Sequence, residues 1–378
     1  MLTEEQRLIR DTIRDFATKE LLPYAAEWDA TASFPREAIK KMGQLGLMGM
    51  LVPANWQGSG ADFLSYVLAI EEIAAGDGSC STIMSVNNSL VCASILQYGT
   101  DEQKQQFLCP LAAGDYLGAF ALTEPQAGSD AANIMTTAVR TNDHYLINGV
   151  KQFITSGKEA DITLVFAVTD KAAGKKGISA FIVPTNIPGY TVARLEHKMG
   201  QKASDTAQLV FDNMPIPLNY RLGKEGEGYK IALSNLEGGR IGIAAQCIGM
   251  ARAALEAALL YAQSRQSFGQ LLIDHQAIAF RLADMATQLE AARQMVWQAA
   301  RLKTAGEPCT LQAAMAKLFA SEVAEKICSA AIQIHGGYGY LQDFAVERIY
   351  RDVRVAQIYE GTSDMQRLLI SRLLRENY

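Results

Sequence analysis

Residues 282–299 read LADMATQLEAARQMVWQA, and this stretch decides how the last third of the chain folds. Apolar residues recur every seven positions in two rows that are offset by three, namely Leu282, Leu289, Val296, Met285, Ala292 and Ala299. Spacings of three and four place all six side chains on one face of an α-helix. The pattern therefore predicts a long helix with an apolar seam for a neighbouring antiparallel helix.

The segments that follow repeat this pattern. Gly306-Glu307-Pro308 separates the first helix from a second stripe, which consists of Met315, Phe319, Val323, Ile327, Ala330 and Ile334. A final helix is expected to begin near Ser363, which forms a predicted capping box with Gln366. Residues from about 224 onward are therefore expected to form a four-helix bundle.

The preceding part of the chain changes character twice. Between about 116 and 223, the runs ITLVFAV, ISAFIV and AQLVF resemble short strands, and Asn148-Gly149 predicts a hairpin turn. Several short strands over about 100 residues favour a compact β-barrel or sandwich. Before residue 115 the pattern is helical, beginning with a capping box of Thr3 and Gln6.

The composition excludes several classes of protein. Of 378 residues, 49% are apolar and 20% are charged, which is typical of a globular chain rather than a disordered one. The net charge of −5 lacks the basic character of a general nucleic-acid binder. No uninterrupted apolar run reaches the roughly 18 residues that span a bilayer, and the charged opening does not resemble a signal peptide. We expect a cytoplasmic protein that binds neither nucleic acid nor membranes.

Six cysteines and four histidines are dispersed along the chain, with no CxxC pair and no metal-ligand spacing. A zinc or iron–sulfur site is therefore not expected, and disulfides are not expected in a long cytosolic chain. We predict that all six cysteines are buried as small apolar side chains.

Two polar segments stand at junctions between the predicted elements. ALTEPQAGSD, residues 121–130, offers hydroxyls at Thr123 and Ser129, and Gly128 lets backbone amides approach a ligand closely. The segment either binds a phosphate or polar ring edge, or forms a plain turn. SRQSFGQ joins two long helices, and its Arg265 either grips a phosphate or pairs with the last helix carbonyls.

Two further segments lie near the end of the chain. IQIHGGYGYLQD, residues 332–343, ends a helix with exposed glycine amides, and its helical period excludes a strand-borne dinucleotide motif. In IYEGTSDMQR, Glu360 follows Tyr359 and precedes Gly361. This carboxylate is either a partner of the helix dipole or a base whose pKa is raised by partial burial.

Taken together, these motifs resemble the acyl-CoA dehydrogenase family over essentially the full chain. ALTEPQAGSD, QKASDTAQLVF, GGRIGIAAQ, SRQSFGQ, QIHGGYGY and IYEGTSDMQR follow the family's order and spacing. IMSVNNSL (83–90) and KGISAFIVP (176–184) are most similar to short-chain and short branched-chain members. The resemblance implies an α+β, mainly α fold with an N-terminal helical domain (1–115), a middle β-barrel (116–223) and a C-terminal four-helix bundle (224–378). It also implies FAD and a homotetramer.

The resemblance assigns roles to single residues. Glu360 aligns with the family's catalytic base, and Gly239 stands where some members carry the base instead. Predicted FAD-binding residues are Phe120, Leu122, Thr123, Gly128, Ser129, Phe153, Thr155, Arg265, Phe268, Gln276, Gln333, Gly336, Gly337, Thr362 and Asp364. Among these, the residues matched to the FAD of the partner subunit are Arg265, Phe268, Gln276, Gln333 and Gly337. Predicted substrate contacts are Ser129, Glu237, Arg240, Tyr359 and Gly361.

The sequence departs from the family pattern at two positions. Phe153 stands where many relatives have Trp, which keeps an aromatic face but loses an indole N–H. Asn133 stands where a small residue is common. Neither departure removes a group that the implied reaction needs.

The implied reaction is the α,β-dehydrogenation of a short-chain acyl-CoA to the trans-2-enoyl-CoA in fatty-acid β-oxidation. Glu360 would remove the α proton while the β hydride passes to flavin N5. The Glu360 backbone N–H and a ribityl hydroxyl of FAD would stabilise the thioester oxygen. An electron-transfer flavoprotein would accept the electrons. The alternatives are a short branched-chain dehydrogenase of amino-acid catabolism, an oxidase that uses dioxygen, and a non-catalytic or nucleic-acid-binding relative.

Overall fold

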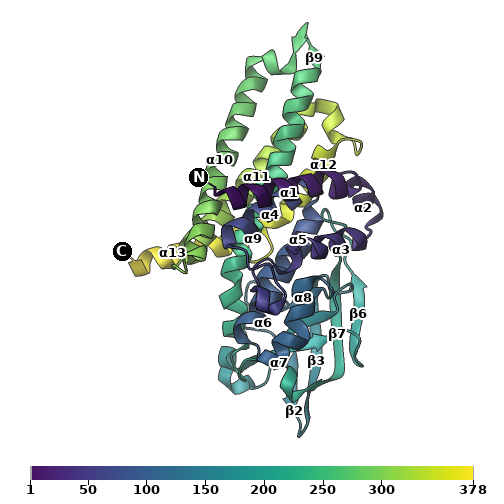
Figure 1. The fold of residues 1–378 in the computed structure, drawn as a ribbon, viewed down its shortest axis with the longest axis vertical. Helices are drawn as coiled ribbons and strands as arrows, with labels where there is room; N and C mark the ends of the chain where they lie inside the picture. Colours follow the sequence, from purple (N-terminus) through teal and green to yellow (C-terminus); the bar gives the residue numbers. More distant parts are fainter. Residues whose placement is uncertain (1, 378) are drawn as a thin grey trace.

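The computed structural model describes residues 2–377, so Met1 and Tyr378, the outer limits of the predicted first and third domains, lie outside the described residues. Figure 1 shows helices in the middle of the molecule, a β sheet at its lower end, and long helices that extend to the opposite tip. Along the chain, helices come first, strands second and helices last. The predicted fold class is therefore confirmed.

The N-terminal part is built from short helices, which are α1 (Glu4–Phe16), α2 (Ala25–Thr31), α3 (Arg36–Gln44), α4 (Phe63–Gly76), α5 (Gly78–Ser85), α6 (Ala93–Tyr98), α7 (Asp101–Gln103) and α8 (Cys109–Ala113). A π-helical segment, η4 (Val86–Cys92), joins α5 to α6. The predicted capping box is confirmed, because Thr3 Oγ1 accepts from the Gln6 backbone N–H and Gln6 Oε1 accepts from that of Thr3, each at 3.1 Å.

The middle part is one eight-stranded sheet in the order β6-β7-β3-β2-β4-β5-β8, with β1 paired in parallel to β4. Its strands are β1 (Gly118–Ala121), β2 (Thr137–Arg140), β3 (His144–Thr155), β4 (Ile162–Val168), β5 (Ile178–Pro184), β6 (Tyr190–Leu195), β7 (Thr206–Pro217) and β8 (Arg221–Leu222). The three strands expected from the sequence are confirmed as β4, β5 and part of β7. Side chains from β1, β3, β4, β5 and β7 share one buried cluster, so the sheet has its own core.

The hairpin predicted at Asn148-Gly149 is wrong, because both residues lie inside β3. Asn148 pairs with Thr137 of β2, and Gly149 pairs with Phe211 of β7 across a shift in register. A Cβ at Gly149 would lie 2.4 Å from Thr136 Oγ1. The glycine therefore allows a close backbone approach at a bulge rather than a tight turn.

The C-terminal part consists of α9 (Gly228–Ser264), α10 (Gln276–Thr304), α11 (Thr310–His335), α12 (Ala345–Val353) and α13 (Ser363–Asn377). The two-residue strands β9 (Gln266–Ser267) and β10 (Gln270–Leu271) form a hairpin between α9 and α10, at the tip furthest from the sheet (Figure 1). The predicted seam on α10 is confirmed, because all six of its residues are buried.

Two details of the C-terminal prediction are wrong. Phe319, predicted to lie on the buried stripe of α11, is 37% exposed, whereas the buried residues of α11 include the small side chains of Ala313, Ala316 and Ala320. Small side chains allow two helices to approach more closely than a phenylalanine would.

The N-cap of α13 is Thr362 rather than Ser363, since Thr362 Oγ1 accepts from the backbone N–H of Met365 at 3.2 Å.

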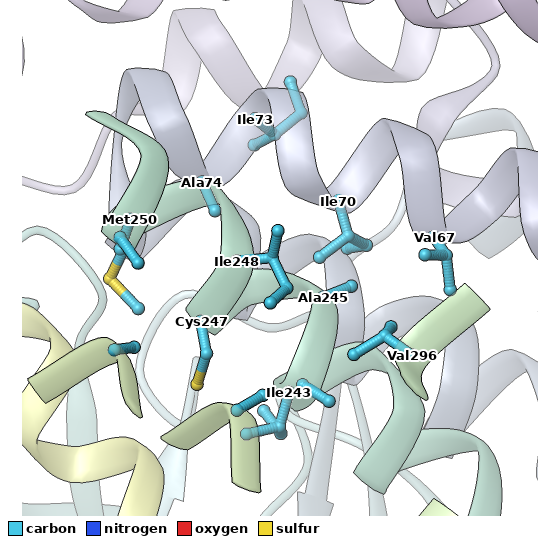
Figure 2. Close-up of a cluster of buried hydrophobic side chains, with 14 of the residues drawn as sticks. Val67, Ile70, Ile73, Ala74, Ile243, Ala245, Cys247, Ile248, Met250 and Val296 are labelled. Carbon is cyan, nitrogen blue, oxygen red and sulfur yellow. The ribbon is translucent and has the colours of Figure 1, made fainter. Parts of the chain in front are cut away.

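The largest core joins the N-terminal and C-terminal helices. Figure 2 shows Ile70 of α4 beside Ala245 and Ile248 of α9, with Val296 of α10 next to them, and Ile73 of α4 belongs to the same buried cluster. All five side chains are buried, and full burial of each large one stabilises the fold by about 1.5–3 kcal/mol. This packing places α9 against α4 and α11.

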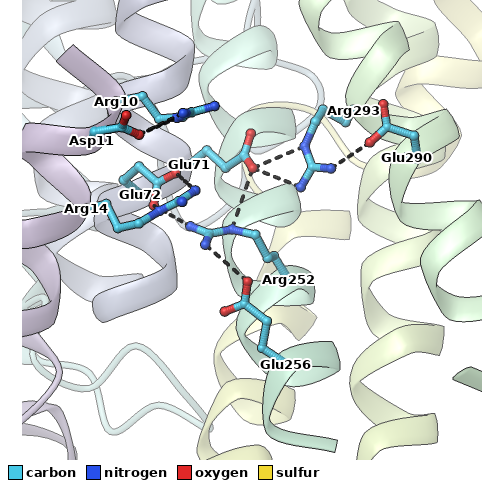
Figure 3. Close-up of polar contacts among 9 residues, drawn as sticks. All are labelled: Arg10, Asp11, Arg14, Glu71, Glu72, Arg252, Glu256, Glu290 and Arg293. Atoms are coloured by element: carbon cyan, nitrogen blue, oxygen red, sulfur yellow. Dashed lines mark hydrogen bonds and ion pairs between the residues drawn. The ribbon is translucent and has the colours of Figure 1, made fainter. Parts of the chain in front are cut away.

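An ion-pair network around the buried carboxylates of Glu71 and Glu72 also connects these helices (Figure 3). Glu72 of α4 pairs with Arg14 of α1 at 2.8 Å and with Arg252 of α9 at 2.5 Å. Its neighbour Glu71 pairs with Arg293 of α10 at 3.0 Å. Breaking a buried pair leaves an uncompensated charge and costs about 3–5 kcal/mol, so the network fixes how α4, α9 and α10 meet.

All six cysteines are buried and free, which confirms the prediction that they are core residues. No cluster of three or more His, Cys, Asp or Glu side chains within residues 2–377 has the geometry to hold a metal ion. Two helical stretches, Gly78–Tyr98 and Gly228–Ser264, are long and apolar enough to cross a bilayer. Their apolar windows are 89% and 61% buried inside the fold, as expected for core helices.

Candidate active site

Glu360 lies in the turn that precedes α13, where two successive residues have left-handed backbone conformations. Its φ is 51°, and that of Gly361 is 93°. A positive φ is uncommon and strained for a residue with a side chain, and such strain concentrates at functional sites. The turn directs the carboxylate toward α9, where a Cβ built on Gly239 would lie only 2.0 Å from Glu360 Oε2. The absence of a side chain at Gly239 therefore makes room for this carboxylate.

The surroundings of Glu360 set its acidity. Burial raises the pKa of Glu360 to about 7, and the positive charges of Lys317 and Arg240 partly oppose that rise. Within residues 2–377, neither Glu360 Oε2 nor Arg240 Nε has a hydrogen-bond partner, although both atoms are buried. A buried polar atom without a partner is costly, so a ligand that formed hydrogen bonds with these two atoms would relieve that cost.

The ring of Tyr359 is held on the other side of the turn. Its hydroxyl donates to Gln246 Oε1 and accepts from Gln201 Nε2 at 3.4 Å. Gln201 Nε2 also donates to the backbone carbonyl of Asp352 at 3.1 Å. Because the hydroxyl of Tyr359 is already bonded to protein groups, this residue would contact a substrate through its backbone or its ring.

Glu237 lies one turn before Arg240 on α9. Its carboxylate accepts from Lys303 Nζ at 2.7 Å and from the hydroxyl of Thr310. Burial opposes ionisation, but these donors lower the pKa of Glu237 below its ordinary value. Its negative charge is therefore already paired across the junction of α10 and α11.

The predicted flavin segment begins at the end of β1. Leu122 is buried in a cluster with Leu90 of η4, and Phe120 packs against the same cluster. Leu90 Cδ2 would also lie 3.4 Å from a Cβ at Gly239. The cluster therefore connects this segment to the part of α9 that faces Glu360. Thr123 is half-buried, whereas Ser129 and Gly128 are exposed.

Phe153 lies in a bulge of β3, where the pairing with β7 shifts register between Lys151 and Ile154. Its φ is 59°, and its ring is 63% exposed, whereas Thr155 remains paired with Thr206. Bulges often re-aim a side chain next to an active site. The preceding residue, Gln152, donates its backbone N–H to the Thr123 carbonyl at 2.9 Å, so the exposed ring of Phe153 lies beside the predicted flavin segment.

A second group of predicted residues meets far along α9, near the hairpin tip. Arg265 lies 5.7 Å above the ring of Tyr338, and both line a concavity with Gly336 and Gly337. At either glycine, a built Cβ meets no atom within 4 Å. The concavity therefore has open space beside a guanidinium group, which suits a phosphate.

The remaining predicted FAD residues lie on exposed surfaces. Phe268 is 99% exposed at the hairpin tip, and Gln276 begins α10 close by. Gln333 lines a separate concavity on α11. Thr362 and Asp364 lie at the start of α13. A single copy of the chain thus leaves Phe268, Gln276 and Gln333 apart from Glu360, whereas Thr362 and Asp364 follow it directly in the chain.

Sequence reasoning missed three buried charged residues near the predicted site. Lys151 is fully buried and donates to Glu124 Oε1 at 2.8 Å and to the Leu122 carbonyl at 3.0 Å. Glu124 also accepts from the backbone N–H groups of Met135 and Thr136, so the pair fixes the loop after β1.

Lys317 is the third missed residue. It is fully buried on α11, and its Nζ donates to the Gly361 carbonyl at 2.6 Å. The sequence holds a signal for it, because position 317 falls on the same helical face as Ala313, Ala320 and Ala324. A lysine on a buried face indicates a paired or functional charge.

The chain is similar to known proteins over nearly its whole length. Family models described as the N-terminal, middle and C-terminal domains of acyl-CoA dehydrogenase match residues 3–115, 119–214 and 226–374. The chain is 50% identical over 377 residues to the mitochondrial short-chain specific acyl-CoA dehydrogenase of Bos taurus, covering 100% of this chain and 92% of the relative.

Two solved structures are also similar over nearly their whole length. Butyryl-CoA dehydrogenase from Megasphaera elsdenii matches with a TM-score of 0.97 and 44% identity, covering 99% of each chain. A chain from the structure of the electron transferring flavoprotein of Acidaminococcus fermentans matches with a TM-score of 0.98 and 48% identity, covering 99% of this chain and 98% of that one.

Proposed function

The chain belongs to the acyl-CoA dehydrogenase family, and from that premise we propose that it oxidises short-chain acyl-CoA thioesters with Glu360 as the base that removes the α proton. The family makes it an FAD-dependent oxidoreductase. The observation that carries the proposal is the buried Oε2 of Glu360, which faces Gly239 and has no hydrogen-bond partner within residues 2–377.

The residues present fit a bound FAD. Gly128, Gly336 and Gly337 border open space, Phe153 offers an exposed aromatic face, and Arg265 offers a cation beside exposed backbone. Phe153 would hold the isoalloxazine ring at β3, whereas Arg265 and Gly337 at the hairpin tip, which lies furthest from the sheet (Figure 1), would bind the phosphates of the FAD of a partner subunit. When it is bound, FAD supplies the two-electron redox chemistry that no protein side chain can perform.

Glu360 has the properties that its role requires. A general base works best when its pKa lies near the working pH, and burial brings the pKa of Glu360 to about 7. The turn aims the carboxylate at α9 and keeps it away from exposed surface, which limits competition from water. Arg240 lies beside it on α9 and opposes protonation of the carboxylate.

The relatives support a short acyl chain. The Bos taurus relative is described as short-chain specific and the Megasphaera elsdenii protein as a butyryl-CoA dehydrogenase. We propose a straight chain of about four to six carbons, and the alternative is a short branched chain. The two classes are close in affinity, because an extra methylene in an apolar pocket changes binding by only about 1–3 kcal/mol.

The electron acceptor and the assembly are also proposed. Similarity to a chain of an electron transferring flavoprotein structure supports such a flavoprotein as the acceptor. Phe268 and Tyr340 are 99% and 87% exposed near the hairpin tip, which supports a contact with another copy in a homotetramer. A cytoplasmic location stays a prediction.

The test of the base is Glu360→Gln. The amide keeps the size of the carboxylate but is not basic, so the variant should retain its yellow flavin and lose nearly all bleaching by butyryl-CoA without oxygen. Glu376→Gln, a change in an exposed carboxylate near the end of α13, is the control and should bleach normally. Normal bleaching by Glu360→Gln would disprove the assignment.

A further inference from the structure

Lys317 occupies an unusual position for a lysine. It lies in the middle of α11 and is fully buried, yet within residues 2–377 no carboxylate oxygen lies within 4.0 Å of its Nζ. Its Nζ donates a hydrogen bond to the carbonyl oxygen of Gly361 at 2.6 Å. An apolar side chain would fill the same space without the cost of burying an ammonium group, so packing alone does not explain this residue.

The bond from Lys317 acts on the strained turn. Gly361 directly follows Glu360, and both residues have positive φ values of 93° and 51°. A second donor, Gln366 Nε2, reaches the same Gly361 carbonyl at 2.9 Å. Two donors on one carbonyl fix the orientation of that peptide plane, and the Glu360 side chain projects from the residue before it.

Charged and titratable groups reach this turn from three sides. Lys317 of α11 and Arg240 of α9 act on Glu360 through their charge, Tyr66 of α4 is a titratable neighbour of Glu360, and Cys247 of α9 is a titratable neighbour of Lys317. Tyr359 is the titratable neighbour on the turn itself. The tyrosine and cysteine pKa values are raised by burial, so those groups stay neutral. Lys317 and Arg240 are therefore the cations that act on Glu360.

The two cations differ in what they touch. Arg240 Nε has no hydrogen-bond partner within residues 2–377, whereas Lys317 is bonded to the turn that carries the base. Burial lowers the pKa of Lys317 to about 8, which still leaves it mostly protonated at neutral pH. Of the two, the lysine exerts the larger opposing effect on the pKa of Glu360.

We propose that Lys317 is a positioning residue for the dehydrogenation. Its ammonium group anchors the Gly361 carbonyl, holds Glu360 in its left-handed conformation, and supplies the positive charge that keeps the buried carboxylate ionised. Lys317 itself accepts and donates no proton during the reaction. The inference rests on the proposed role of Glu360 as the base.

Two substitutions test the charge separately from the hydrogen bond. Lys317→Gln can still donate to the Gly361 carbonyl but carries no charge. Gln366→Met removes the other donor to the same carbonyl and changes no charge, so it is the matched control. The rate of flavin bleaching at saturating butyryl-CoA is measured without oxygen between about pH 6 and pH 9, where a base of near-neutral pKa titrates.

Loss of a nearby cation raises the pKa of a carboxyl group by about one unit or more. The acid limb of the Lys317→Gln profile should therefore move about one unit to higher pH. At pH values below this limb, the rate of Lys317→Gln should be about tenfold lower than that of the wild type, because one pKa unit changes the ionised fraction of the base tenfold. The rate should approach that of the wild type at high pH, and KM should change less than kcat. Gln366→Met should keep the wild-type limb.

A wild-type limb in Lys317→Gln would overturn the proposal. Lys317→Arg gives a second check, because it keeps the charge and should keep the limb even if its rate is lower; a shifted limb in that variant would also count against the proposal. Glu360→Gln, measured in parallel, separates this inference from the proposed function. If Glu360→Gln bleaches normally, the base assignment fails, whereas an inactive Glu360→Gln with an unshifted Lys317→Gln limb refutes only the role of Lys317.

Discussion

Replacing Gly239 with alanine should displace the carboxylate of Glu360 without harming the fold. Gly239 lies inside α9, and a Cβ there would meet Glu360 Oε2 at 2.0 Å and Cδ at 3.0 Å. The next contact, Leu90 Cδ2 at 3.4 Å, is an ordinary one. The new methyl group therefore collides only with the end of one flexible side chain, that of Glu360.

The size of the effect follows from these distances. To reach an ordinary contact distance, the carboxylate must withdraw by about 1 Å or more. A misplacement of about 1 Å in a reacting group can cost about 100-fold in rate, which corresponds to about 2.7 kcal/mol in the activation barrier. Alanine in place of glycine within a helix adds about 1 kcal/mol of helix propensity, so stability should not fall.

The neighbouring glycine provides the control. Gly238 lies beside Gly239 in α9, and the nearest atom to a Cβ there would be Phe63 Cζ at 3.5 Å, which is an ordinary contact. Gly238→Ala should therefore keep both its flavin and its rate of bleaching by butyryl-CoA. Gly239→Ala should keep its flavin, shown by the visible absorbance, and bleach about 100-fold more slowly. Equal rates in the two variants would refute the view that the carboxylate beside Gly239 does the chemistry.

The remaining predictions concern stability and cofactor retention. Lys151→Met should cost about 3–5 kcal/mol in urea unfolding, because it leaves the buried Glu124 carboxylate unpaired; a loss below about 1 kcal/mol would contradict this. Although burial opposes it, Lys151 and backbone donors lower the pKa of Glu124 to about 2, so its stabilising effect is complete above about pH 4.5 and is lost as the pH falls toward 2. Arg265→Ala should weaken FAD retention and oligomer stability together, measured by flavin content after gel filtration; a fully flavinated, unchanged oligomer would argue against a contact across subunits.

Some features were predictable because they depend on short stretches of chain. The capping box at Thr3 and the seam on α10 arise from spacings within one or two helical turns. The strand runs were predictable for the same reason. Asn148-Gly149 misled because its two residues fit both a tight turn and a bulge, and only the pairing of β3 with β7 distinguishes these.

Glu360 was predictable as a candidate base, but its environment was not. The sequence left open whether it caps a helix or removes a proton, since both need a carboxylate before a helix start. Gly239 of α9 makes room for its carboxylate, and Lys317 of α11 supplies a nearby positive charge. Both helices lie far from Glu360 along the chain.

The sequence alone therefore determined the order of helices and strands, the buried seams, and the motifs that place the chain in its family. Only the tertiary structure decided which charges surround the base and which glycine makes room for it. The physical reason is that the two kinds of feature depend on interactions of different range along the chain. Periodicity and capping are set by neighbours in the chain, whereas desolvation and Coulomb interactions depend on distances in space that helix packing alone creates.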